Sequence, residues 1–255
     1  MPFSLHHNTL LYGIRNIMLF KGARYKNLLI FYTKRGIKFF YYFCAVNTFD
    51  ILEHLQNQDP VLKRVFSETL VPPDLSLRQD LYFNLLESIV SQQLSVKAAD
   101  TIFKRFLGLF PDAYPHPPLV QAMETDQLRG AGLSFQKSAY LKNTAAFFLE
   151  NNLEQHTWEQ MTDDEITHFL TRIKGVGKWT VQMLLMFTLG RPDVFPADDL
   201  GIQQAMRRLY AIEGDDIRTL KTQMHALAAP WQPHRTLVCR YLWHWKDTPA
   251  LKNAT

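Results

Sequence analysis

The apolar residues of this chain recur at helical spacing over most of its length, and this periodicity restricts the fold more than any other feature. In the segment DLYFNLLESIV, Tyr82, Leu85, Leu86 and Ile89 stand at i, i+3, i+4 and i+7, the pattern of one buried helix face. Residues 200–210 repeat the same spacing, and from about residue 47 onward no sustained two-residue alternation appears. The sequence therefore predicts an all-α fold.

Local signals place several helix ends. Ser95 can cap a second helix after the break SQQLS, and Thr162 with Glu165 forms a capping box before the next apolar run. Pro111, Pro115, Pro117 and Pro118 predict a loop. A strongly apolar segment at residues 179–188 predicts a central, buried helix.

The charge is unevenly distributed. The chain has a formal net charge of +4, yet residues 1–49 carry seven Lys and Arg and no acidic residue, so the remainder holds 21 basic and 24 acidic residues. Any nucleic-acid surface on the body must therefore be a local basic patch. We interpret residues 1–46 as a basic, aromatic leader that is not necessarily part of the native fold, and residues 47–255 as the folded domain.

Composition excludes several classes of protein. Cys44 and Cys239 are too few for a disulfide framework, a four-cysteine iron–sulfur cluster or a zinc ribbon, so no metal site is predicted. Lys34, Arg35 and Lys38 interrupt the most apolar region of the leader, and the longest uncharged run in that region, residues 39–49, is too short to cross a bilayer. We expect an intracellular protein without a membrane segment.

A Gly-Val-Gly turn separates two apolar helical patterns in the stretch LTRIKGVGKWTVQMLLMF. Without side chains at Gly175 and Gly177, the amides that enter the second helix are accessible and can hold a phosphate oxygen. Lys174 and Lys178 flank the turn with positive charge. Such a turn can bind a DNA backbone without reading bases, whereas a plain turn between two helices would need the glycines only for its conformation.

Two adjacent aspartates, Asp198 and Asp199, follow this helix by about twenty residues, after Pro196. Either can cap the helix that starts there and complement its dipole. A carboxylate at that point could instead stabilise positive charge on a sugar and orient or deprotonate an attacking water.

The pattern LxxIxGVGxWT, a long apolar helix and then Pro-x-Asp-Asp together resemble the helix-hairpin-helix and Gly/Pro/Asp signature of the base-excision DNA glycosylase superfamily. The similarity is greatest to the alkylbase glycosylases, the DNA-3-methyladenine glycosylase II type. Three further motifs agree in order: SIVSQQLSVKAA, GAGLSFQKSAYLKNTA and WQPHRTLVCRYLW. The resemblance covers residues 81–245 and implies two helical subdomains flanking a cleft.

By its place in the motif Asp199 matches the family's catalytic aspartate, and we expect Asp198 or its backbone to cap the helix. Family members that also cut the strand carry a lysine two residues after the second turn glycine, where this chain has Trp179. Lys178 is one position away, about 100° round the helix. The resemblance therefore implies a monofunctional enzyme that uses water and leaves an abasic site.

The resemblance also implies a base pocket and a wedge. Trp179 would stack on a flipped, cationic base, although core packing is its ordinary alternative. Met183 and His234 stand where the bacterial type member has aromatic pocket residues, which leaves the lesion range open. Gln93 takes the slot of the side chain that fills the gap left by the flipped nucleotide, with Leu94 beside it; an exposed loop is the alternative.

The sequence thus predicts a glycosylase that removes alkylated purines of the 3-methyladenine and 7-methylguanine type from duplex DNA. A helix-hairpin-helix module that only binds DNA, and a glycosylase for another lesion class, are the alternatives. We expect a monomer that needs no cofactor, in the cytoplasm and nucleoid or in a nucleus. Residues Lys174, Gly175, Val176, Gly177 and Lys178 would form the DNA-binding hairpin, and whether it holds a monovalent cation stays open.

Overall fold

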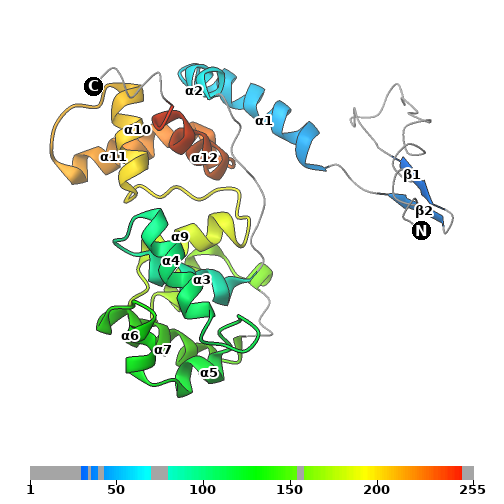
Figure 1. Ribbon diagram of the computed structural model, residues 1–255. Coiled ribbons are helices and arrows are strands. Elements are labelled where there is room, and N and C mark those ends of the chain that lie inside the picture. Colours follow the sequence, from blue (N-terminus) through cyan, green and yellow to red (C-terminus); the bar gives the residue numbers. More distant parts are fainter. Residues whose placement is uncertain (1–29, 34–35, 40–42, 70–79, 154–157, 249–255) are drawn as a thin grey trace, which may run out of the picture. The chain divides into compact units, whose positions relative to one another are not determined.

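A computed structural model describes residues 30–33, 36–39, 43–69, 80–153 and 158–248 (Figure 1). The chain divides into two compact units, Met1–Phe66 and Ser67–Thr255. Most of the predicted leader, residues 1–29, 34–35 and 40–42, lies outside the described residues. Whether residues 1–46 belong to the native fold stays a prediction.

The first unit contains a short hairpin followed by helices. Strands β1 (Ile30–Thr33) and β2 (Gly36–Phe39) pair antiparallel, with Ile30 opposite Phe39. Helix α1 (Phe43–Gln58) begins inside the predicted leader, and α2 (Leu62–Glu68) runs across the boundary into the second unit.

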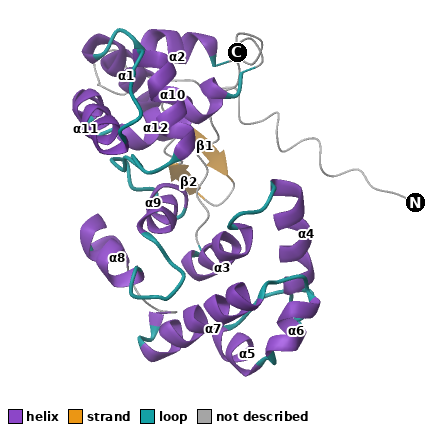
Figure 2. Ribbon diagram, turned by 90° about the vertical axis from the view of Figure 1, so that its left-hand side faces the viewer, coloured by secondary structure: helices purple, strands orange, loops and turns teal. Residues whose placement is uncertain are grey.

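All regular secondary structure among the described residues of the second unit is helical, and the helices form two groups (Figure 2). The first group comprises α3 (Leu81–Ser91), α4 (Val96–Leu107), α5 (Pro117–Ala122), α6 (Thr125–Gly130), α7 (Phe135–Glu150), α8 (Asp163–Leu170) and α9 (Lys178–Phe187), with a short 3-10 turn, η3 (Trp158–Gln160). Within it α3 packs on α4, α7 and α9, while α7 also contacts α5 and α6.

The second group comprises α10 (Leu200–Tyr210), α11 (Ile217–Ala228), the 3-10 turn η4 (Ala229–Trp231) and α12 (Arg235–Lys246). Helix α10 packs on α12, and α11 packs on η4. Trp231 and Trp245 are fully buried in this part of the core, as Phe106 and Phe148 are in the first group. The predicted all-α class is confirmed, as is its division into two helical groups.

The predicted helix starts are confirmed where a side chain caps them. Ser95 accepts a hydrogen bond from the amide of Ala98, and Thr162 and Glu165 form the capping box of α8. The four apolar residues predicted to face the core from α3 are all buried, because their spacing places them on one side of the helix.

The loop predicted from the prolines at 111–118 is wrong in part, because α5 starts at Pro117. Pro117 and Pro118 occupy the first two positions of the helix. A proline there loses no helical hydrogen bond and has its φ already set for the helix, so it starts a helix as readily as it interrupts one.

In the part of the chain that the structure describes, no helix combines the length and the apolar character needed to cross a membrane.

Candidate functional site

The turn between α8 and α9 is built on two glycines with different structural requirements. Gly175 has φ +101°, a conformation that side chains disfavour, and a Cβ built on it would lie 2.3 Å from the ring of Tyr140 on α7. Gly177 has φ −95°, and a Cβ there would meet nothing within 4 Å. Gly175 is thus needed for folding of the turn, whereas Gly177 leaves an open surface.

Helix α9 begins immediately after that open surface. Gly177 is its N-cap and offers no side-chain cap to the first amides. Lys174 and Lys178 are exposed on either side, while Val176 is 5% exposed and anchors the turn in the core. Exposed N-terminal amides between two lysines form a surface that suits an anion such as a DNA phosphate.

The segment between α9 and α10 is tied to the first turn of α12. Arg235 donates to both carboxylate oxygens of Asp193, at 2.7 and 2.8 Å. The Thr236 hydroxyl donates to the Arg191 carbonyl and accepts from the Val194 amide. The bidentate ion pair between Arg235 and Asp193 and the hydrogen bonds of Thr236 fix the backbone of residues 191–194, which precede Asp199.

Asp199 is half-buried, and its carboxylate accepts three hydrogen bonds. Its Oδ1 accepts from the Ile202 amide at 2.8 Å and from Trp243 Nε1 at 2.8 Å, and its Oδ2 accepts from Trp179 Nε1 at 2.9 Å. A carboxylate has about four lone-pair positions, so one position on Oδ2 stays open for another donor. The donors come from α9, α10 and α12, so the site lies where the two helical groups meet.

The prediction that Asp198 caps the helix is wrong, because Asp199 is the N-cap of α10. Asp198 is exposed, and its carboxylate pairs instead with Lys221 on α11. With the extended backbone of Asp199, φ −73° and ψ 122°, its side chain reaches the Ile202 amide three residues on. One carboxylate therefore serves as the helix cap and as the predicted catalytic group.

Sequence reasoning missed the role of Trp243. Trp243 ends the motif WQPHRTLVCRYLW, and nothing in the local sequence links position 243 to position 199. Gly201 explains how the indole approaches: a Cβ there would lie 3.0 Å from both Trp243 Cδ1 and Asp199 Oδ1. The signal available was Gly201, a glycine in the first turn of the helix that follows the Pro-x-Asp-Asp motif.

The predicted pocket residues lie on two helices. Trp179 and Met183 are four residues apart and share a face of α9, and Trp179 is 42% exposed. Its indole edge binds Asp199, which orients the ring while leaving a large part of it accessible. His234, partly exposed, is the N-cap of α12.

The predicted wedge lies in the loop of residues 92–95 between α3 and α4. Gln93 is exposed with φ +57°, a left-handed conformation unusual for a side chain with a Cβ. Leu94 is 37% exposed. The neighbouring Gln92 donates from Nε2 to the carbonyl of Gly175 at 3.2 Å, which connects this loop to the hairpin.

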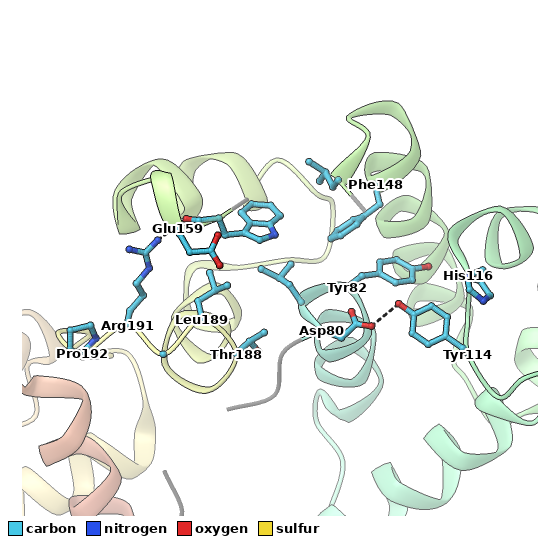
Figure 3. A pocket seen from close by; sticks show the side chains of 14 residues that line it. Asp80, Tyr82, Tyr114, His116, Phe148, Glu159, Thr188, Leu189, Arg191 and Pro192 are labelled. Carbon is cyan, nitrogen blue, oxygen red and sulfur yellow. Dashed lines mark hydrogen bonds between the residues drawn. The ribbon is translucent and has the colours of Figure 1, made fainter. Parts of the chain in front are cut away.

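A cavity of about 1080 Å³ lies elsewhere, near the C-terminus of α9 (Figure 3). Thr188, Leu189 and Arg191 line it on one side, and Asp80 accepts a hydrogen bond from the Tyr114 hydroxyl on the other. None of the predicted site residues lines this cavity. Trp179, which the sequence predicts to bind the base, lies at the other end of α9.

Cys239 on α12 is a buried free cysteine. Burial raises the pKa of the Cys239 thiol far above its usual range, which keeps it protonated and unreactive. Within residues 30–33, 36–39, 43–69, 80–153 and 158–248, no three His, Cys, Asp or Glu side chains cluster as metal ligands would.

The HhH-GPD superfamily of base excision DNA repair proteins matches residues 86–233. The chain belongs to this superfamily. Among its relatives, DNA-3-methyladenine glycosylase 1 of Schizosaccharomyces pombe is 35% identical over 170 residues, which are 65% of this chain and 72% of the relative.

Solved structures of two other proteins are similar to this chain. One is the S. pombe 3-methyladenine DNA glycosylase Mag1 in complex with abasic DNA, with a TM-score of 0.68 and 31% identity over 78% of this chain and 98% of that one. The other is a DNA-3-methyladenine glycosidase from Bacillus halodurans, with a TM-score of 0.68 and 32% identity over 78% and 90%.

We predict that an alanine at the two hairpin glycines impairs different properties, stability at position 175 and DNA binding at position 177. Gly175→Ala should lower the free energy of unfolding by about 1–3 kcal/mol, because it forces a strained φ and displaces Tyr140. Gly177→Ala should cost under about 1 kcal/mol as an N-cap change, yet weaken DNA binding by covering the open amides. Urea denaturation and fluorescence anisotropy with duplex DNA measure the two effects; equal stability losses would contradict the assignment.

Proposed function

We infer that this protein is a monofunctional DNA glycosylase of base excision repair, which hydrolyses the N-glycosidic bond of alkylated purines in duplex DNA. The observation that carries this inference is the Asp199 carboxylate, which Trp179 and Trp243 orient through hydrogen bonds. The Trp179 ring beside it is exposed, and helix α9 connects this site to the hairpin. The names and DNA complex of its relatives support the same reaction and substrate class.

Asp199 would stabilise the positive charge that develops on the deoxyribose. Water supplies the oxygen that bonds to C1′, while the C1′–N bond breaks and its electrons leave with the base. The open lone-pair position on Oδ2 can hold this water and accept its proton. An N-alkylated purine is already cationic and leaves as a neutral base, so this reaction needs no strong general acid.

Trp179 would bind the flipped base through the face of its ring. A cation is attracted to the π-electrons of an indole by roughly 0.5–2 kcal/mol, so the ring favours alkylated purines over neutral ones. Its edge stays on Asp199, which places the base beside the catalytic group. Met183 and His234 would form other walls of this pocket. Because aromatic residues stand at these two positions in the bacterial type member, the proposal does not specify which alkylated purines the pocket accepts.

The hairpin and the loop of residues 92–95 would hold the DNA. Residues 174–178 bind a phosphate through the amides at the start of α9, with Lys174 and Lys178 adding charge. Gln93 enters the gap in the stack, and Leu94 lies beside it. The enzyme acts as a monomer without a cofactor. Carbonyls of the hairpin can also hold a monovalent cation. The enzyme acts where DNA is found, in a nucleoid or nucleus.

The principal alternative, a module that binds DNA without chemistry, predicts the same hairpin but requires no oriented carboxylate. The three hydrogen bonds on Asp199 favour the enzyme. A glycosylase for another lesion class shares all of these features and differs only in the bases released.

Asp199→Asn tests the chemistry directly. We expect release of 3-methyladenine and 7-methylguanine from methylated duplex DNA to fall by about 10²-fold or more, because the negative charge is lost. Binding to DNA should change little. Asp198→Asn, which removes only the surface pair with Lys221, is the matched control and should retain activity. Chromatography of released bases gives the rates; the absence of base release by the unaltered protein, from any lesion, would contradict the proposal.

Trp243→Phe tests the orientation of the carboxylate. The single-turnover rate should fall roughly tenfold, the equivalent of one hydrogen bond of about 1.4 kcal/mol, while the affinity for abasic DNA changes under about twofold. Trp245→Phe on the same helix removes an indole bond to Glu68 and should affect stability alone. Similar rates for the two variants would exclude a role for Trp243 in catalysis.

Borohydride should trap no covalent adduct with alkylated or abasic duplex DNA. Trapping requires an amine that forms a Schiff base with the sugar, and position 179 holds a tryptophan. Denaturing electrophoresis of labelled DNA detects any adduct. A trapped species would indicate a bifunctional lyase, and its loss in Lys178→Met would identify the amine.

A further inference from the structure

The first turns of α7 contact both segments that the proposed function places on DNA. Lys137 donates from Nζ to the carbonyls of Val90 and Gln92, each at 2.7 Å. These carbonyls end α3, immediately before the exposed Gln93. A lysine from a separate helix therefore closes the C-terminus of α3 at the base of the wedge loop, residues 92–95.

This position suits a cation. The last carbonyls of a helix have no partner within it and carry partial negative charge, which an ammonium group satisfies. The Lys137 ammonium group is partly buried where it bonds to these carbonyls, and this burial lowers its pKa.

The same face of α7 supports the hairpin. Tyr140, one turn after Lys137, packs against Gly175 so closely that no side chain fits there. The Gly175 carbonyl in turn accepts from Gln92, whose own carbonyl accepts from Lys137. One helix face thus holds the wedge loop directly and through the hairpin.

The wedge loop needs such support because its own conformation is unfavourable. Gln93 has φ +57°, a left-handed backbone that costs of order 1 kcal/mol or more for a residue with a Cβ. Within the loop, the Leu94 amide donates to the Ser91 carbonyl at 3.2 Å. The bonds from α7 add an external restraint that this single turn does not supply.

We propose that Lys137 is a positioning residue for base flipping, which together with Gln92 holds the wedge loop at a set position relative to the DNA-binding hairpin. The proposal rests on the proposed function. A wedge keeps a base out of the stack only if its loop stays in position relative to the hairpin, which holds the phosphates. Unstacking and unpairing a base cost a few kcal/mol, and the wedge loop must keep its conformation against this cost.

The test compares a substrate that resists flipping with one that does not. A single 7-methylguanine is placed opposite cytosine in one duplex and opposite an abasic-site analogue in the other, where no base pair has to be broken. Single-turnover release is measured for the unaltered protein and for Lys137→Met, Lys137→Arg and Gln92→Leu. Lys142→Met, a charge removal further along α7, is the matched control.

We expect Lys137→Met to slow release from the paired duplex by about tenfold or more, and from the unpaired duplex by under about threefold, because only the first must be forced open. Lys137→Arg keeps a cation with several donors and should restore most of the rate. Gln92→Leu should show the same substrate dependence, and Lys142→Met should leave both rates unchanged. Fluorescence of 2-aminopurine beside the lesion should report less unstacking in Lys137→Met.

Other outcomes separate the two proposals. An equal loss on both duplexes, or no loss on either, would overturn the role of Lys137 in flipping while leaving the glycosylase assignment in place. Failure of the unaltered protein to release base from either duplex would count against the proposed function itself.

Discussion

The carboxylate of Asp199 accepts hydrogen bonds from three helices at once, and the geometry of the candidate site depends on this one group. Its Oδ1 completes the N-terminus of α10 and holds the Trp243 indole, while Oδ2 holds Trp179 from the other helical group. A charged acceptor strengthens each of these bonds, and each bond restricts the rotation of the side chain. The group that would stabilise a developing cation is therefore oriented before substrate arrives, which is the condition for electrostatic catalysis.

Helix α9 connects the proposed binding of DNA with the proposed chemistry. Its first amides face the open surface at Gly177, and Trp179 in the same turn donates a hydrogen bond to Asp199, the proposed catalytic carboxylate. A phosphate bound at the start of this helix would lie beside the turn that carries Trp179, the proposed base-binding residue. Because both contacts belong to one rigid element, the register between backbone and base would be set by the helix itself.

Much of the fold could be predicted because its signals are local. Caps such as Ser95 and the Thr162–Glu165 box act within four residues, and buried helix faces follow from spacing alone. Two predictions were wrong for a related reason. The prolines at 117 and 118 are compatible with a loop or with a helix start. Adjacent aspartates are equivalent as helix caps until the backbone conformation places one of them at the N-cap. Local sequence left both alternatives open, and packing selected between them.

The sequence by itself determined the helical class, the Gly-Val-Gly turn and the aspartate after it, since each depends on residue types at short, regular spacing. Tertiary structure alone decided that Trp243 binds Asp199 and that Lys137 closes α3 beneath the wedge loop. Trp243 and Asp199 are 44 positions apart in the chain, and Lys137 is 47 positions from Val90 and 45 from Gln92. A hydrogen bond forms only when donor and acceptor meet within about 3 Å at a suitable angle, and the packing of whole helices brings them together.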